Sequence, residues 1–402
     1  MSELLFSGLK VIDCGSYIAA PAATMILADL GADVVKIEPL GAGDPYRQVH
    51  RLPGNPAADL DYGSLLDNRG KRGLAIDLAG DDGRDVLRRL VTAADVFVTN
   101  YPIAARGRLG IDEASLVALN ERLIYGSFTA YGEKGEEATK PGFDTTAYWS
   151  RSGLMDQVRT DGAAVPARSV AGMGDHPSAM SMYAGIVTAL LQRERTGKGT
   201  VVRSSLLANG LWANGFLGTA ALNAAPFTPR PPREEAMNAL TCHYRCADDA
   251  WIVLAVLNEE RQWPLLADGL GLSHLKDDPR FLTKPDRLAS SRELVACFDE
   301  AFGARPRAHW VEVLRAAGIV FEMVATPQDI HDDLQARTNG YVVDYPALPG
   351  VRSVATPFFV DGVPTAPASP PPSPGQHTAE LLAELGYADA DIARMRATGT
   401  IA

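Results

Sequence analysis

Four polar clusters that contain glycine hold most of the residues able to do chemistry. They span residues 38–47, 67–72, 100–108 and 129–144. In open α/β sheets, ligands bind in the crevice outside the carboxyl ends of the strands. Because these clusters fall near the ends of predicted strands, the sequence predicts one ligand site assembled from several of them.

Each cluster also has a plainer interpretation when it is taken alone. The run Asn68-Arg-Gly-Lys-Arg72 is typical of a solvated polar loop. Asn100-Tyr-Pro is typical of a turn, because the residue before proline is usually extended. Asp144 precedes Thr145-Thr-Ala-Tyr-Trp149, so it could cap a helix rather than take part in catalysis. Spacing alone leaves both roles of Asp144 open.

Several common enzyme classes lack their minimum motifs here. The first predicted strand–helix turn, Gly15-Ser-Tyr-Ile-Ala-Ala-Pro21, misses two of the three glycines of a dinucleotide-binding loop. No Gly-x-Ser-x-Gly elbow, Gly-x-x-x-x-Gly-Lys-Ser/Thr loop or His-Glu-x-x-His pair occurs. Cys242-His243-x-x-Cys246 supplies at most three ligands and has no second pair nearby, so we expect no metal site.

The elements that must position these clusters follow from the apolar pattern. Strands are expected at 9–15, 33–38, 73–77, 95–100 and 123–128, alternating with helices at 20–30, 81–94 and 113–120. This alternation predicts a doubly wound α/β domain with a parallel sheet. Further on, we expect helices at 177–196 and 378–396, a short strand after Gly199, a hairpin within 240–256 and largely helical structure over 258–317.

Chain length and proline content suggest how the domains are divided. A chain of 402 residues predicts two or three domains. We expect a large Rossmann-like domain over 1–224, to which 331–402 return, and a smaller α+β domain over 225–330. The proline-rich stretches 226–232 and 364–374 predict a linker and an extended strap.

Charge and composition limit the partners that the protein can have. The net charge of −11 argues against a nucleic-acid or anionic-membrane surface, since both need basic fields. No signal peptide and no run of ~20 apolar residues is found. Together with only four cysteines, these features predict a cytoplasmic protein.

Taken together and in order, the clusters resemble the class III CoA-transferases. This family includes the formyl-CoA, carnitine and bile-acid CoA-transferases and also the α-methylacyl-CoA racemases. The similarity covers nearly the whole chain, and its most specific stretches are Phe6-Ser-Gly-Leu-Lys-Val-Ile-Asp13, Leu27-Ala-Asp-Leu-Gly-Ala-Asp-Val-Val-Lys-Ile-Glu-Pro39, Asn68-Arg-Gly-Lys-Arg72, Ala94-Asp-Val-Phe-Val-Thr-Asn100, Gly142-Phe-Asp144 and Arg195-Thr-Gly-Lys-Gly199.

The resemblance implies an activity, a nucleophile and an assembly. It implies that acyl-CoA and carboxylic acids are the substrates, that no cofactor is permanently bound, and that two chains interlock as rings in a homodimer. It also implies that Asp144 carries the acyl group through an anhydride and an aspartyl-CoA thioester. A carboxylate suits this chemistry, because an aspartate with an ordinary pKa of ~3.9 is an ionised nucleophile at pH 7.

The resemblance further implies contacts to CoA. Tyr17 and Ile18 match the turn that holds the pantetheine arm, and Asn100, Tyr101 and Arg108 match a motif that lines the CoA site. Candidate partners of the phosphates are Lys71 and Arg72, with Lys36 and Lys140 as further possibilities.

Three departures from the family pattern leave alternatives open. The racemase pattern has a histidine directly before the aspartate, and Phe143 stands there in this sequence. Pro39 replaces an arginine that touches the CoA nucleotide in several relatives, and the active-site glycine run is missing from 225–245. The alternatives are a racemase, an intramolecular CoA transferase and a silent CoA-binding protein. Phe143, Tyr148 and Trp149 hint at an apolar acyl pocket, and His176 is expected to be structural.

Overall fold

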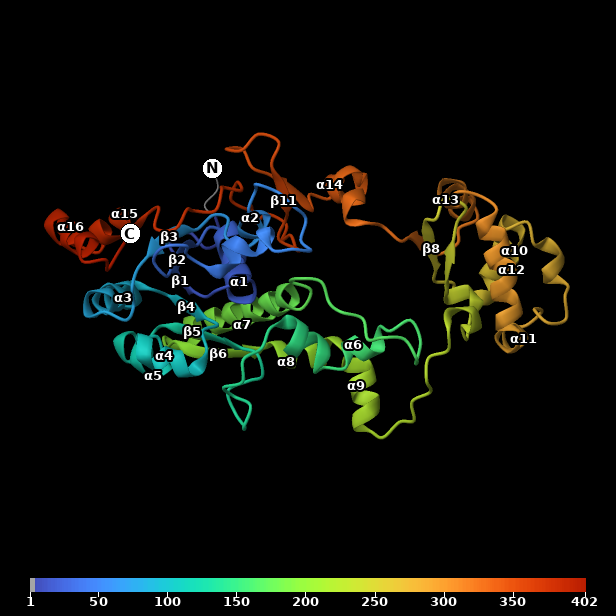
Figure 1. Ribbon diagram of the computed structural model, residues 1–402, viewed down its shortest axis with the longest axis horizontal. Coiled ribbons are helices and arrows are strands. Elements are labelled where there is room, and N and C mark those ends of the chain that lie inside the picture. The colour runs from blue at the N-terminus through green and yellow to red at the C-terminus, as the bar shows by residue number, and fades with distance from the viewer. Residues whose placement is uncertain (1–3) are drawn as a thin grey trace. The chain divides into compact units, whose positions relative to one another are not determined.

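Residues 4–402 are described by the computed structural model, and they form two compact units (Figure 1). The first unit contains the chain up to Gln157, then Ala167–Asn223 and Gln335–Ala402. The second unit contains Val158–Pro166 and Ala224–Leu334. The chain therefore passes repeatedly between two bodies, each with its own hydrophobic core.

A parallel sheet of six strands forms the centre of the first unit, in the order β3-β2-β1-β4-β5-β6. The strands are β1 (Lys10–Cys14), β2 (Asp33–Glu38), β3 (Arg72–Ala75), β4 (Val96–Thr99), β5 (Ile124–Thr129) and β6 (Thr200–Ser205). The prediction of a doubly wound α/β sheet is therefore confirmed. From β1 the chain adds strands outward to β2 and β3, and from β4 it adds them in the opposite direction to β5 and β6. This switch in strand order between β1 and β4 opens a crevice at their carboxyl ends.

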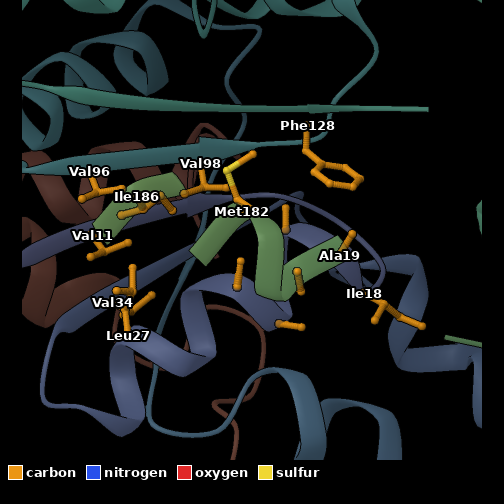
Figure 2. Packing of buried hydrophobic residues seen from close by; sticks show 14 of the residues in the cluster. Val11, Ile18, Ala19, Leu27, Val34, Val96, Val98, Phe128, Met182 and Ile186 are labelled. Carbon is orange, nitrogen blue, oxygen red and sulfur yellow. The ribbon is translucent and has the colours of Figure 1, made fainter. Parts of the chain in front are cut away.

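Two helices, α1 (Ala19–Asp29) and α7 (Asp175–Thr196), cover one face of the sheet. Figure 2 shows Val11, Val34 and Val96 of the strands turned toward this layer, with Leu27 and Ile186 coming from the helices. Each of these side chains is almost fully buried, and full burial of an aliphatic side chain contributes ~1.5–3 kcal/mol. The packing fixes where the two helices begin, next to the crevice.

The opposite face is covered by α3 (Asp81–Ala93), α5 (Glu113–Leu119), α15 (Thr378–Glu384) and α16 (Asp389–Ala397). β4 is buried on both faces, so its apolar run is continuous rather than alternating, and β2 is buried in the same way although Lys36 and Glu38 are charged. The prediction of a single helix over 378–396 is wrong, because the structure has two helices there, α15 and α16. Gly386, whose φ of 82° is left-handed, ends α15 and separates it from α16.

The C-terminal segment closes the edge of this sheet. Ile401 forms an antiparallel bridge with Ile76, just past β3, and Asp77 N–H donates to the Thr400 carbonyl at 2.9 Å. The proline-rich strap 364–374 has no helix or strand. The strap belongs to the first unit and is bound to the end of α1, where Ala366 N–H donates to the Asp29 carbonyl at 2.7 Å.

Shorter elements complete the first unit. They are η1 (Pro45–Arg51), α2 (Tyr62–Asp67), α4 (Ile103–Leu109), η2 (Asp144–Ser150), α6 (Leu154–Gln157), α8 (Leu206–Ala213), α9 (Gly215–Leu222) and the hairpin of β10 (Val342–Asp344) and β11 (Arg352–Val354). Along the sequence, the second unit ends at Leu334, the first residue of helix α14 (Leu334–Thr338), and the first unit resumes at Gln335.

The second unit combines a three-stranded antiparallel sheet with four helices. Its strands are β7 (His243–Arg245), β8 (Trp251–Leu254) and β9 (Phe321–Met323), and its helices are α10 (Glu259–Gly269), α11 (Lys284–Ala289), α12 (Ser291–Gly303) and α13 (Arg307–Ala316). The hairpin expected within 240–256 is confirmed by β7 and β8. Cys242 and Cys246 lie in the apolar core of this unit. Among residues 4–402, no helix is long and apolar enough to cross a bilayer.

Candidate active site

The crevice between β1 and β4 is bridged by a reciprocal pair of hydrogen bonds. Ser16 N–H donates to Asn100 Oδ1 at 2.8 Å, and Asn100 Nδ2 donates to the Ser16 carbonyl at 2.7 Å. Only an amide side chain can accept and donate in this way. Asn100 therefore fixes the β1–α1 loop against the chain that leaves β4.

A buried carboxylate gives the same loop its unusual backbone. Asp44 Oδ1 accepts hydrogen bonds from Tyr17 N–H at 3.1 Å and Tyr46 N–H at 3.0 Å, while Asp44 Oδ2 accepts from Lys36 Nζ at 3.0 Å. Tyr17 has a φ of 60°, a conformation that non-glycine residues rarely adopt. The hydrogen bond to Asp44 holds this strained residue, and its ring meets Phe143 edge-on with centroids 5.5 Å apart.

Asp144 begins η2, a π-helical turn of the kind often found at functional sites. Asp144 Oδ1 accepts from Thr145 N–H at 2.6 Å, and Oδ2 accepts from Gly174 N–H at 3.3 Å. Gly174 is the N-cap of the 22-residue helix α7, so the positive end of that helix faces the carboxylate. Both oxygens are thus held by backbone donors, in a residue that is only 7% exposed.

Asp175 and His176 follow in the first turn of α7. Burial, followed by the negative charge of Asp144, raises the pKa of the Asp175 carboxyl to about 7. His176 Nε2 lies 3.0 Å from Asp67 Oδ1, and Tyr46 Oη donates to Asp67 Oδ2 at 2.9 Å. Burial opposes the charged imidazolium, but the hydrogen bond to Asp67 raises the pKa of His176 above its ordinary value.

A cavity of about 790 Å³ in the first unit contains both carboxyl groups, Asp144 and Asp175. Its wall includes apolar side chains from several elements, among them Ile18, Phe128 and Leu206. Ile18 and Phe128 also belong to the core in Figure 2, so the cavity wall continues the packed face of the sheet. A volume of this size suits a small organic ligand.

Four of the nine residues predicted for the site line this cavity: Tyr17, Ile18, Asn100 and Asp144. They come from the β1–α1 loop, the end of β4 and the start of η2. The structure thus brings together segments that are far apart in the sequence. Of the three aromatic residues suspected of forming an acyl pocket, Phe143 lines the cavity, whereas Tyr148 and Trp149 are buried in the core.

Two predicted phosphate ligands are engaged by carboxylates instead. Lys71 Nζ lies 2.7 Å from Asp13 Oδ2, and both side chains are completely buried. Arg72 makes a bidentate pair with Asp33 and also pairs with Glu380 and Glu384 of α15. These ion pairs occupy both cations within the protein itself.

The other predicted residues do not line this cavity. Tyr101 is partly buried, and burial raises the pKa of its phenol to about 12. Lys140 Nζ lies 2.6 Å from Glu137 Oε1 and 4.8 Å from the centre of the Tyr131 ring. Arg108 is exposed, and its guanidinium has no ion pair or hydrogen bond among residues 4–402.

Sequence reasoning missed the parts played by Asp44 and Asp175. Asp44 lies in a predicted cluster, but nothing local indicates that its carboxylate reaches back to the backbone of Tyr17. Asp175 directly precedes His176 at the start of a predicted helix, where an acidic residue is expected for the helix dipole alone. Gly174-Asp175 is part of the resemblance to the family, but only the fold places this residue in the same cavity as Asp144.

Together, a doubly wound sheet and a cavity at its strand ends define an α/β protein with a Rossmann-like ligand site. The sequence model of CoA-transferase family III matches residues 6–378. The chain therefore belongs to CoA-transferase family III, and it is an enzyme of that class.

Individual relatives agree with this assignment. The chain is 32% identical over 389 residues to the (R)-2-hydroxy-4-methylpentanoate CoA-transferase of Clostridioides difficile, with 96% of each chain covered. It is 30% identical over 394 residues to the cinnamoyl-CoA:phenyllactate CoA-transferase of Clostridium sporogenes, covering 96% of this chain and 95% of that protein. The crystal structure of a CAIB/BAIF family protein from Brucella suis matches with a TM-score of 0.83 at 28% identity, covering 96% of this chain and 100% of that chain.

Proposed function

We propose that this enzyme transfers CoA from an acyl-CoA to a carboxylic acid, with Asp144 as the covalent nucleophile. An Asp144 oxygen attacks the thioester carbonyl, the C–S bond breaks, and CoA leaves as a thiolate from the resulting mixed anhydride. The thiolate then attacks the Asp144 carbonyl, which releases the donor acid and leaves an aspartyl-CoA thioester. The acceptor carboxylate repeats these steps in reverse and leaves as its CoA thioester.

The observation that carries this proposal is the way Asp144 is held. Its carboxylate faces a cavity of about 790 Å³, and the amides of Thr145 and Gly174 bind its two oxygens. Donors aimed at one place stabilise charge that develops there without reorganisation. The start of α7 favours negative charge at the same point, which suits a tetrahedral oxyanion.

Proton transfer beside the thioester is the chemistry of the rival racemase reaction, and it finds less support. The residue directly before Asp144 is Phe143, whose ring can neither accept nor donate a proton. That ring packs against Tyr17 at the cavity. We therefore propose Asp144 as a nucleophile rather than as one member of an acid–base pair.

We propose that the acyl groups are apolar and of moderate size. Val49, Phe128, Phe143 and Leu206 line the cavity near the nucleophile, and such a wall favours alkyl or aryl groups over small dicarboxylates. The two relatives are named for branched and aryl 2-hydroxy acids, which fits this class. Activity with succinate, glutarate or oxalate alone would contradict the proposal.

We propose that CoA reaches this cavity past the β1–α1 loop and the chain after β4. Tyr17 and Ile18 are the proposed contacts of the pantetheine arm, Asn100 and Tyr101 line its path, and the unpaired Arg108 is available to a phosphate.

We further propose that two chains interlock in a homodimer. In the single chain, Trp212 and Phe216 are 86% and 89% exposed, and a second chain would bury them. Light scattering that gives one chain's mass, 42.9 kDa, would contradict the dimer.

Covalent trapping tests the function directly. The enzyme is incubated with 4-methylpentanoyl-CoA or cinnamoyl-CoA and then with hydroxylamine, and its peptides are analysed by mass spectrometry. We expect a hydroxamate at Asp144 in the wild type and none in Asp144→Asn. Asp156→Asn is the matched control, because Asp156 does not line the cavity, and it should keep the hydroxamate. No adduct at Asp144, with turnover intact, would refute the proposal.

A further inference from the structure

A single cation lines the reaction cavity. Of the residues between 4 and 402 that form its wall, Arg168 alone carries a positive charge, and neither a lysine nor a histidine stands among them. The rest of the wall consists of apolar side chains, hydroxyl groups, amides and carboxyl groups. Carboxylic acids are anions at neutral pH, so every acid that enters or leaves the cavity is negative. The reaction proposed above has not yet used this arginine.

The backbone is fixed on both sides of Arg168. Before it, the Ala167 carbonyl accepts a hydrogen bond from Nε1 of the buried Trp149 at 2.7 Å. After it, Ser169 Oγ lies 2.9 Å from Thr145 Oγ1, which belongs to the first turn of η2. These two contacts hold the main chain of Arg168 against the element that carries the proposed nucleophile.

The guanidinium of Arg168, in contrast to its backbone, is free. Within residues 4–402 it has no ion pair and no hydrogen bond, and the side chain is exposed. Arg106 shows the alternative, because it is buried and donates to the carbonyls of Tyr101 and Phe128, so its donors are used by the fold. A free guanidinium offers a planar fork of N–H donors that matches the two oxygens of a carboxylate. The cavity wall therefore contains an unused group that can bind an anion.

Two anions could use this group, a phosphate of CoA or the carboxylate of the acid. The pantetheine arm separates the CoA phosphates from the thioester, so a cation in the wall of the reaction cavity meets the acyl end of the substrate. An acid that enters this largely apolar space loses hydration of its charge, and a charge-assisted hydrogen bond offsets that loss. The position of Arg168 therefore favours the carboxylate.

We propose that Arg168 binds the carboxylate of the acid substrate and selects acids over their uncharged analogues. This inference rests on the CoA transfer proposed above and assigns the residue that recognises the acid. One carboxylate oxygen accepts a hydrogen bond from the guanidinium, which leaves the other oxygen free to attack the aspartyl-CoA thioester. Arg168 keeps all its protons, and no bond to it forms or breaks. The same contact serves the donor acid as it leaves and the acceptor acid as it enters.

Equilibrium binding tests the role of Arg168 without turnover. (R)-2-hydroxy-4-methylpentanoate is titrated by calorimetry into the enzyme saturated with CoA, because a free acid and free CoA do not condense without an energy source. In Arg168→Gln the Kd of the acid should rise about 10–50-fold, as expected for the loss of a hydrogen bond to a charged group. Arg168→Lys keeps the charge but not the fork, so its Kd should rise less. The uncharged 2-hydroxy-4-methylpentanamide should bind equally to all three proteins.

A matched control removes a nearby arginine that does not line the cavity. Arg151 is 51% exposed and pairs with Glu137, so Arg151→Gln should bind the acid like the wild type. Since Arg168 has no partner within the described chain, Arg168→Gln should also keep the wild-type melting temperature. In steady-state assays, Arg168→Gln should raise KM for the acid and leave KM for 4-methylpentanoyl-CoA unchanged.

The outcomes separate this inference from the function on which it rests. An equal Kd of the acid in the wild type and Arg168→Gln, or equal losses for the acid and the amide, overturns the role of Arg168. An increase confined to KM for acyl-CoA, and absent with the matching 3′-dephospho-CoA thioester, assigns Arg168 to a phosphate and also overturns the inference. A wild type that binds the acid through Arg168 but transfers no CoA overturns the proposed function alone.

Discussion

Replacing Lys71 with methionine should destabilise the first unit strongly. The ammonium of Lys71 has four oxygen acceptors within reach of its three N–H groups: Asp13 Oδ2 at 2.7 Å, the carbonyls of Pro21 and Asp67 at 2.8 Å, and Asn68 Oδ1 at 2.9 Å. Both Asp13 and Lys71 are completely buried. Methionine fills a similar volume but leaves the Asp13 carboxylate short of a partner, which costs about 3–5 kcal/mol when a buried pair is broken.

Thermal unfolding followed by circular dichroism measures this loss. For a domain of this size, ~4 kcal/mol corresponds to a fall in melting temperature of about 10 °C. The matched control is Lys140→Met. Lys140 is 43% exposed and pairs with Glu137 at the surface, so its loss should cost less than ~1 kcal/mol.

The opposite pattern would refute this reasoning. If Lys71 serves a CoA phosphate, Lys71→Met should leave the melting temperature close to that of Lys140→Met and should raise KM for acyl-CoA. That increase would then shrink with the matching 3′-dephospho-CoA thioester. A strong loss of stability without a selective effect of the 3′-phosphate supports the structural role.

Three further changes give distinct readouts. The folded protein keeps the proton of Asp175 up to about pH 7, whereas the unfolded chain loses it near pH 3.8, so the free energy of unfolding of the wild type should fall as pH rises between these values. Relative to the wild type, Asp175→Asn should therefore be more stable by about 2 kcal/mol at pH 8 and equally stable at pH 4. Urea unfolding at the two pH values measures this difference. In Gly174→Ala the new Cβ would lie 2.5 Å from Tyr148 Cγ, so kcat should fall at least ~10-fold, whereas Gly215→Ala, which meets nothing within 4 Å, should keep full activity. Asn100→Asp cannot donate to the Ser16 carbonyl and should raise KM for acyl-CoA about 5–50-fold, with a loss of ~1–3 kcal/mol in stability; an unchanged KM would contradict the role of this bridge.

Most helices and strands of the first unit could be predicted from the local sequence. β4 is buried on both faces, and its sequence Val-Phe-Val-Thr is a short apolar run that is easily distinguished from a surface element, whereas β2 is buried despite its charged residues Lys36 and Glu38. The end of helix α7 could also be predicted from the sequence, because a left-handed residue, here Gly197 with a φ of 73°, commonly ends a helix and is usually glycine. The break inside 378–396 was missed, since Gly386 interrupts a pattern whose apolar spacing continues on both sides.

The site was only partly predictable, because its pairings join distant segments. The polar run Asn68-Arg-Gly-Lys-Arg72 suggests a solvated or phosphate-binding loop. Lys71 instead meets Asp13, 58 residues earlier in the chain. Likewise, the amide that binds Asp144 Oδ2 comes from Gly174, 30 residues later. Resemblance to a family pointed to Asp144, but only the fold assigns partners to its two oxygens.

The closure of β3 by the last residues has a consequence for how the protein is made. Ala75 N–H donates to Thr378 Oγ1, a partner 303 positions away, and Ile76 forms its bridge with Ile401. Contacts of such long separation form late and slow folding. The second unit, almost all of it the continuous segment Ala224–Leu334, leaves the ribosome before these partners exist. During synthesis, one edge of the large sheet therefore stays open until translation is nearly complete, and this is the interval in which a chaperone that shields strand edges would help most.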